Sequence, residues 1–547
     1  MASISGQLVD IHQRTIRPAI VHFEQGVIQS IQDIPEAPQH YLLPGFVDAH
    51  VHVESSMLSP AQFARLAVVQ GTVATVSDPH EIANVLGVPG VEWMIENARR
   101  VPFTFCFGAP SCVPATTFET AGAVLTPEDV QYLLSTYPEV GYLAEVMNFP
   151  GVLNGDPDML AKIHIAQTLG YPVDGHAPGL RGKNAKRYAE AGCQTDHECF
   201  TADEALDKLS FGMKILIREG SAARNFDALI PLLPQHYGQL MFCSDDKHPD
   251  GLVLGHINAL VKRALALYPN HLFEILQVAC WNPVEHYRLP VGQLRAGDSA
   301  DFIVIDSLTN FSILKTYIRG ELVADQGKSL ISSLLSDPIN QFNAKETVPE
   351  DFQIPYQEST ATVQVIEALD GQLITNALTE RLVAKNGFLE SDTEQDILKI
   401  AVINRYQAAP PAVAFIRNFG LKQGALASCV AHDSHNIVAV GADDESISRA
   451  VNLIIQEKGG ISAVGSADEL ILPLPIAGIL SGEDGYWVAE QYATLDQYAK
   501  TELGCSLGSP FMSLSFMALL VIPNLKLSDK GLFNGSTFQF TEVILPN

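Results

Sequence analysis

The chain has few basic residues for its length. Its 547 residues include 34 Lys and Arg against 62 Asp and Glu, which gives a formal net charge of −28. Such an excess of negative charge repels nucleic-acid phosphates and anionic membrane surfaces. We therefore expect no nucleic-acid and no membrane partner, and a small neutral or cationic molecule is the easier ligand.

Closely spaced cysteine pairs and long apolar runs are also missing. The eight cysteines form no CxxC pair, and a chain of this length does not depend on disulfides. The first 20 residues lack the basic and then apolar segments of a secretory signal. The apolar stretch 511–525 is interrupted by Ser, Pro and Asn and is shorter than the roughly 20 residues that span a bilayer. These features predict a cytoplasmic protein in which 511–525 is core.

Short β-rich segments alternate with segments of helical period between residues 44 and 285. Segments such as SPAQFARLAVVQ begin with cap signals and end near Gly or Pro, as helices do. This alternation predicts parallel strands joined by crossover helices. Eight such units in roughly 240 residues match a closed (β/α)₈ barrel. An open doubly wound sheet is the alternative. The eight candidate strands are 42–52, 71–80, 101–109, 140–147, 171–179, 193–200, 211–221 and 238–246.

Two further regions complete the predicted α/β chain. Residues 1–43 and 286–345 contain short alternating strands and Gly-containing turns, and they predict one small discontinuous β-sandwich domain around the barrel of 44–285. A polar linker precedes a C-terminal α+β domain at 360–547. In that domain DDESISRAVNLIIQEKGG predicts a helix, capped by Asp443 or Asp444 and ended by Gly459.

Polar residues stand at the C-terminal ends of several predicted strands, the face that carries the active site in a parallel barrel. The first strand ends in His50-Val51-His52, whose period of two points both imidazoles to one side. A single HxH is a weak signal, but its combination with the other strand ends is a strong one. These carry Glu145, His176, His197 with Glu198, and Asp245 with Asp246.

A mixed His and carboxylate set of this size predicts a metal site. It suits Mn²⁺, Fe²⁺ or Zn²⁺ better than a thiolate-selected metal. Six donors exceed one tetrahedral site with an open position but suffice for two ions, with Glu145 as the protein bridge. Two ions lower the pKa of a shared water toward neutrality. The expected chemistry is hydrolysis or hydrolytic deamination.

Seven motifs carry a resemblance to the bacterial adenine deaminases, a branch of the amidohydrolase superfamily, over nearly the whole chain. HxH alone marks only the superfamily, whereas HVESSM, DPHEIANV and MNFPGV together are specific to the branch. The motifs are PGFVDAHVHVESSM, DPHEIANVLG, AEVMNFPGV, DGHAPGL, IREGSAARN, the SDD of 244–246 and HDSHNIV.

The resemblance implies deamination of adenine to hypoxanthine and ammonia, as in purine salvage, at a two-metal site. Mn²⁺ is the expected ion, with Fe²⁺ and Zn²⁺ as alternatives. Glu145 replaces the carboxylated lysine that bridges the metals of many relatives. A homo-oligomer, such as a dimer, is also implied. The implied ligands are His50, His52, Glu145, His176, His197 and Asp245.

Catalytic and substrate roles can be assigned to further residues. Asp245 would accept the proton of the attacking hydroxide and deliver it to the leaving amino group. Glu198 would protonate a ring nitrogen, with Glu54 in reserve; a salt bridge is the competing interpretation of Glu198. The expected substrate contacts are Glu54, Ser55, His80, Glu81, Arg218 and Glu219, although His80 and Glu81 could hold an additional metal and Arg218 and Glu219 could form ion pairs. The roles of His432, Asp433 and His435 stay open.

Three other functions compete with this interpretation. A cyclic-amide hydrolase of dihydroorotase or hydantoinase type shares barrel and metal chemistry, but its bridging lysine is missing. A nucleic-acid base deaminase would need a CxxC beside the HxE of 52–54. A non-catalytic barrel would have lost ligand residues that are all present. Another 6-substituted purine remains an alternative substrate.

Overall fold

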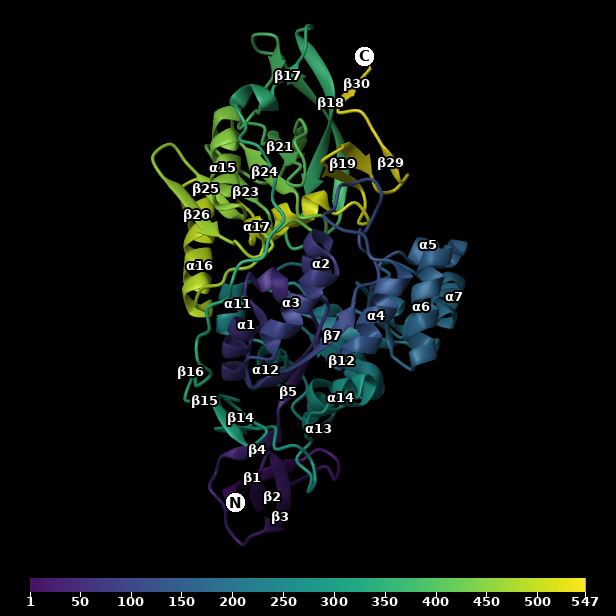
Figure 1. The fold of residues 1–547 in the computed structure, drawn as a ribbon, viewed down its shortest axis with the longest axis vertical. Helices are drawn as coiled ribbons and strands as arrows, with labels where there is room; N and C mark the ends of the chain where they lie inside the picture. Colours follow the sequence, from purple (N-terminus) through teal and green to yellow (C-terminus); the bar gives the residue numbers. More distant parts are fainter. Residues whose placement is uncertain (547) are drawn as a thin grey trace.

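The computed structural model describes residues 1–546, and its parts follow one another along the long axis of the molecule (Figure 1). A small β-sheet that contains the N-terminus lies at one end. The parallel barrel occupies the middle, and the C-terminal domain forms the other end. Within the described residues, no helix combines the length and the apolar character needed to cross a membrane.

Eight consecutive parallel strands form the barrel. They are paired as one five-stranded and one three-stranded sheet, β5 to β9 and β10 to β12. The sheets meet where Asp245 N donates to His50 O and Gln194 N donates to Val173 O, both at 2.9 Å. Each expected strand is present, in shorter form. The strands are β5 Phe46–Val51, β6 Thr72–Ser77, β7 Thr104–Ala109, β8 Val140–Val146, β9 Val173–Gly175, β10 Thr195–Asp196, β11 Lys214–Arg218 and β12 Leu240–Cys243.

Helices follow the strands and cover the outside of the barrel, and their ends obey the capping signals of the sequence. In α4, Thr126 and Asp129 form a capping box. In α6, Asp156 caps the start and Gly170 ends the helix with φ +79°. The helices are α1 Pro60–Ala67, α2 His80–Leu86, α3 Val88–Ala98, α4 Pro127–Thr136, α5 Phe149–Asn154, α6 Pro157–Leu169, α7 Gly182–Ala191, α8 Ala202–Ser210, α9 Phe226–Leu229, α10 Leu233–His236, α11 Pro249–Leu254, α12 Ile257–Leu267, α13 Leu272–Leu276 and α14 Asn282–Tyr287.

The small β-sheet combines four strands that precede the barrel in the sequence with four strands that follow it. Its order is β16-β15-β14-β13-β4-β1-β2-β3, and β4 pairs antiparallel with β13 through Leu43 and Ile303. The sequence led us to expect a sandwich, whereas hydrogen bonds link all eight strands in one sheet. The strands are β1 Ala2–Asp10, β2 Thr15–Glu24, β3 Val27–Asp33, β4 Tyr41–Pro44, β13 Phe302–Ile305, β14 Ile313–Ile318, β15 Glu321–Asp325 and β16 Lys328–Ser329.

The C-terminal domain is built on a mixed nine-stranded sheet with helices against it. The expected helix is α15 Asp444–Glu457, where Asp443 accepts a bond from Ser446 N. Its other helices are α16 Gly485–Thr501 and α17 Pro510–Ser515, the latter fully buried as expected. The strands are β18 Thr360–Ala368, β19 Thr375–Val383, β21 Leu398–Ile403, β22 Ala412–Arg417, β23 Ala425–Ser428, β24 Ile437–Gly441, β25 Gly460–Val464, β26 Glu469–Pro473 and β30 Ile544–Leu545, with the separate pair β17 Ile354–Pro355 and β20 Phe388–Leu389 and the hairpin strands β27 Leu525–Ser528, β28 Gly531–Asn534 and β29 Gln539–Phe540.

The C-terminal domain packs on the face where the barrel strands end. One apolar cluster includes Leu66 of the barrel and Val488 of α16. Polar contacts cross the same boundary: Ser481 N donates to Met57 O at 2.8 Å, and Asn436 Nδ2 donates to Thr120 O at 2.9 Å. The barrel face that carries the polar strand ends is therefore covered by a second domain.

Candidate metal centre

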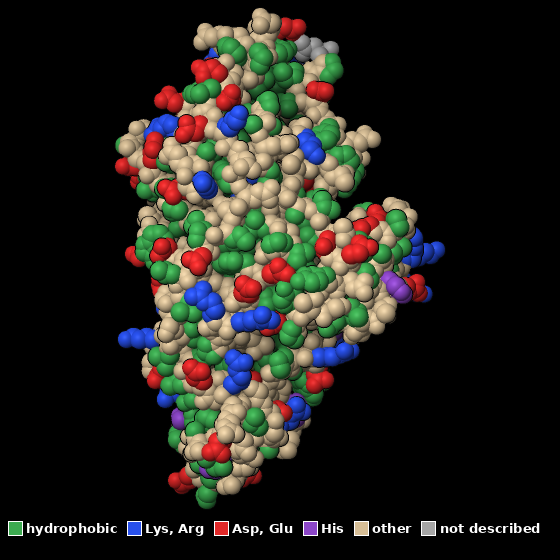
Figure 2. Space-filling model, in the orientation of Figure 1, with side chains coloured by type: hydrophobic (Ala, Val, Ile, Leu, Met, Phe, Trp, Pro, Cys, Tyr) green, Lys and Arg blue, Asp and Glu red, His purple; other side chains and the backbone are tan. Residues whose placement is uncertain are grey.

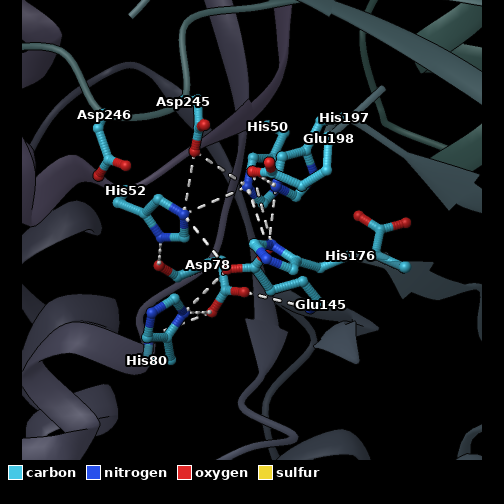
Figure 3. A network of polar contacts seen from close by, with 12 residues as sticks. His50, His52, Asp78, His80, Glu145, His176, His197, Glu198, Asp245 and Asp246 are labelled. Carbon is cyan, nitrogen blue, oxygen red and sulfur yellow. Dashed lines mark hydrogen bonds and ion pairs between the residues drawn. The ribbon is translucent and has the colours of Figure 1, made fainter. Parts of the chain in front are cut away.

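Two histidines begin the site at the end of β5. His50 and His52 project to the same side because they are two residues apart. Their Nε2 atoms lie 3.2 Å from each other and 3.5 and 3.2 Å from Asp245 Oδ1 (Figure 3). His52 Nδ1 lies 3.2 Å from the carbonyl of Asp78, a contact that turns its other nitrogen toward the cluster.

Glu145, at the end of β8, lies between the histidines. Its Oε2 is 2.8 Å from His176 Nδ1 and 3.0 Å from His197 Nε2, while its Oε1 is 3.5 Å from His52 Nε2. Burial would raise the pKa of Glu145, but His176 and His197 lower it well below its usual range. Each carboxylate oxygen thus faces a different group of imidazoles, which is the arrangement that a bridging ligand requires.

Asp245 follows β12 in a left-handed conformation, φ +54°, that is uncommon for a residue with a side chain. Its Oδ1 faces the two histidines of β5, and its Oδ2 is 2.5 Å from Arg218 Nη1. Burial would raise the pKa of Asp245, but Arg218 is the main group that lowers it well below its usual range. The carboxylate is therefore held charged with one oxygen turned toward the cluster.

Arg218 also binds Glu198, through Nη1 and through Nη2 at 3.0 Å from Oε2. Burial would raise the pKa of Glu198, yet Arg218 brings it below its ordinary value. The salt bridge that competed with the acid role of Glu198 is therefore present. Arg218 lies between two buried carboxylates rather than at a free edge of the site.

The side chains that converge here fit a divalent metal. Several sets of three or four have donor atoms within 4.8 Å of one another, among them His50 with His52 and Asp245, and His50 with Glu145 and His197. All are buried, and neither His50 Nδ1 nor His176 Nε2 has a hydrogen-bond partner among the described residues. Six expected ligands are thus brought together in a donor set that suits borderline divalent ions.

The expected substrate residues of the first loop are buried beside the cluster. Ser55 Oγ donates to Asp246 Oδ1 at 2.5 Å, so this serine orients a carboxylate. Glu54 accepts from Ile82 N at 3.3 Å through Oε1, and its Oε2 has no partner among the described residues. Burial raises the pKa of Glu54 to about 7.

Glu219 lies elsewhere than expected. Its Oε2 is 2.9 Å from Arg263 Nη1, a half-exposed residue of the outer helix α12. The carboxylate is therefore turned toward the outside of the barrel, and the geometry gives no support to a substrate contact. Arg218 and Glu219 both take part in ion pairs, the alternative that the sequence left open.

His80 and Glu81 begin α2 after the second barrel strand. His80 Nδ1 is 3.6 Å from Glu145 Oε1, so this ring borders the cluster. Glu81 instead contacts His432 and His435 of the C-terminal domain. Asp78, to which no role was assigned, accepts from Glu145 N at 3.2 Å and approaches His80 Nδ1 at 3.2 Å. Asp78 directly follows β6, and this position at the C-terminal end of a barrel strand is the sequence signal that could have identified it as a site residue.

A cavity of about 1030 Å³ opens at the boundary between the barrel and the C-terminal domain, and none of the six expected ligands lines it. Met147, Pro178 and Phe200, which follow barrel strands, line one side, and Ile374 and Phe538 of the C-terminal domain line the other. Figure 2 shows the surface hollowed between the C-terminal domain and α5. The cavity therefore lies over the loops that follow β8, β9 and β10 and not at the ligands themselves.

A parallel barrel whose strand ends present buried histidines and carboxylates is the architecture of a metal-dependent hydrolase. The amidohydrolase family matches residues 41–323, and the adenine deaminase C-terminal domain matches residues 372–539. The chain is 54% identical to an adenine deaminase of Salinibacter ruber, with 99% of this chain and 98% of that protein covered. Identity is 55% to the adenine deaminase of a Sulfurovum species, with 98% of both chains covered, and 46% to that of Borreliella burgdorferi, with 98% and 99% covered. The chain belongs to the adenine deaminase family of the amidohydrolases.

Solved structures resemble part of the chain. The N-acetyl-D-glucosamine-6-phosphate deacetylase of Mycobacterium smegmatis is 14% identical, covers 59% of this chain with its whole length and aligns with a TM-score of 0.46.

Proposed function

We propose that the chain hydrolyses adenine to hypoxanthine and ammonia at the cluster of Figure 3. The observation that carries the proposal is the position of Glu145, with one oxygen facing His52 and the other facing His176 and His197. Family membership at about half sequence identity over the full length supports the substrate. A cyclic-amide hydrolase is not favoured by these relatives.

Divalent ions would be held by His50, His52, Glu145, His176, His197 and Asp245. We infer two ions, with Mn²⁺ the expected metal and Fe²⁺ and Zn²⁺ as alternatives, because the donors are imidazole and carboxylate. Such ions supply an activated water and polarise the group under attack.

Asp245 is suited to transfer the proton. Arg218 binds its Oδ2, which leaves Oδ1 facing the cluster. In the proposed reaction Oδ1 accepts a proton from the attacking water and passes it to the amino group that leaves as ammonia. The buried surroundings exclude bulk water from this transfer.

The donor to the ring nitrogen is Glu198 or Glu54. Glu198 is engaged by Arg218 through both oxygens, whereas Glu54 keeps one oxygen without a partner among the described residues. This geometry favours Glu54 as the donor and Glu198 as an acceptor of a purine N–H. Comparison of Glu54→Gln with Glu198→Gln tests the assignment: the variant of the donor should lose more in kcat, and the variant of a binding residue more in KM.

The deciding experiment is an ammonia-release assay with adenine, other 6-substituted purines and a hydantoin on the Mn²⁺-loaded protein. Adenine should give the highest kcat/KM. Ring opening of the hydantoin without ammonia from adenine would overturn the proposal. The proposal includes a cytoplasmic location, which the eight buried free cysteines support. It also includes a homodimer, which light scattering of the purified protein tests.

A further inference from the structure

A second group of buried ligand-type side chains lies where the barrel meets the C-terminal domain. His80 and Glu81 come from α2, and His432, Asp433 and His435 come from the loop between β23 and β24. None is more than 3% exposed. We call these five residues the seam cluster.

Glu81 is the centre of the seam cluster. Its Oε1 contacts His432 Nδ1, and its Oε2 contacts His435 Nε2, both at very short range. His80 Nε2 lies 3.3 Å from Glu81 Oε1 and 3.8 Å from Asp433 Oδ1. Three imidazoles and two carboxylates therefore share one buried region.

Mutual pairing does not satisfy the cluster. Asp433 Oδ2 has no hydrogen-bond partner among the described residues, and His432 Nε2 has only a 3.7 Å contact with Asp246 Oδ1, although both atoms are buried. No Lys or Arg within residues 1–546 forms an ion pair with any of the five. A buried carboxylate oxygen without a partner, such as Asp433 Oδ2, is costly unless a cation satisfies it.

We propose that the seam cluster binds a further divalent cation, held by His80 Nε2, Glu81 Oε1 and Asp433 Oδ1. Their donor atoms lie within 4.8 Å of one another, and spacings of 3.3 and 3.8 Å are those of neighbouring ligands about 2.1 Å from one ion. His432 Nδ1 is the next donor, and His435 fixes the second oxygen of Glu81. The donor types suit Mn²⁺, Fe²⁺ or Zn²⁺.

This ion is separate from those proposed at the barrel strand ends. No seam ligand belongs to that set, and His80 separates the two regions, with Nδ1 facing Glu145 and Nε2 facing Asp433. Because Asp433 belongs to the C-terminal domain and His80 to the barrel, the ion would join the two domains. The proposal does not depend on the identity of the substrate.

The test is a metal count on the full chain. Protein stripped with a chelator, reloaded with Mn²⁺ and desalted should hold one Mn²⁺ more per chain than Glu81→Gln and Asp433→Asn treated alike. Crystals of the wild type measured at the manganese edge should show an anomalous peak between His80 and Asp433. Equal counts in folded wild type and variants, or no peak there, would overturn the proposal.

A matched control is His248→Gln, which removes another buried imidazole of the same boundary, one that packs on Tyr492 at 4.5 Å between ring centroids. This variant should keep the full count. If Glu81→Gln fails to fold, Asp433→Asn and the anomalous map decide alone. Failure of adenine turnover with the extra ion present would refute the proposed function and leave this site intact.

Discussion

The six expected metal ligands at the barrel strand ends together with Arg218, which we call the strand-end cluster, and the seam cluster both place imidazoles around one buried carboxylate, but they are assembled differently. In the first, Glu145 and its histidines stand at the ends of β5, β8, β9 and β10 of one barrel. In the second, Glu81 and His435 come from two domains and lie 354 residues apart in the chain. The first cluster also contains a cation of its own, Arg218, and the second has no paired Lys or Arg among the described residues.

This difference shows what each cluster depends on. The strand-end cluster depends on the barrel, because hydrogen bonds between parallel strands fix the positions of its residues. The seam cluster depends on domain packing, so it exists only while the two domains are in contact. A change confined to one cluster should therefore leave the other intact, and the following variants test that independence.

The largest effect is expected from Glu145→Gln. An amide cannot place a negative oxygen toward both groups of histidines, so metal at the strand ends should be lost and kcat for adenine should fall by about 10³-fold or more. Metal analysis and steady-state kinetics measure both effects. The seam ion should remain, because none of its ligands is changed.

Asp174→Asn is the matched control for this variant. Asp174 is a buried barrel carboxyl that binds Thr195 and Tyr287, and burial raises its pKa to about 7. An amide can replace the half-protonated acid there, so metal content should stay at the wild-type value. Full activity of Glu145→Gln would show that Glu145 does not bridge.

The sequence predicted the strand-end cluster because strand period and strand order determine it. A period of two brings His50 and His52 to one side, and the rule that parallel strands end at one face adds Glu145, His176 and Asp245. The helix caps Thr126 and Asp443 can also be predicted from sequence, because each accepts a hydrogen bond from the backbone amide three residues later. Local chemistry and regular repetition are visible in one sequence.

Contacts between distant segments were not predictable. Nothing in the sequence shows that Arg218 binds Glu198 and Asp245 together, or that Glu219 turns outward to Arg263. The partners of HDSHNIV stayed open because the docking of the C-terminal domain on α2 decides them. Such pairs depend on tertiary packing, for which strand and helix periods carry no signal.

The second variant, Arg218→Met, tests the internal cation of the strand-end cluster. Without the guanidinium, Glu198 and Asp245 stay buried and keep only histidines as partners, and the free energy of unfolding should fall by about 3–5 kcal/mol. Urea unfolding with a chelator present measures the loss. In the double variant with Glu198→Gln the losses should be less than additive, because one stranded charge is then absent; full additivity would contradict the pairing.

The smallest effect is expected at Lys526 of β27, a second buried basic residue that we compare with Arg218. Lys526 Nζ donates to Leu373 O at 2.7 Å and Phe516 O at 2.8 Å but has no carboxylate, and burial lowers its pKa from the ordinary 10.5 to about 7. Between these pH values the unfolded chain binds more protons than the folded one, so this lysine makes stability rise with pH, by at most about 1.4 kcal/mol per unit. In urea unfolding from pH 7 to 9, Lys526→Met should show a smaller slope than wild type. At pH 6, where Lys526 is protonated in both states, the two slopes should converge, and equal slopes throughout would show that Lys526 keeps its proton in the fold.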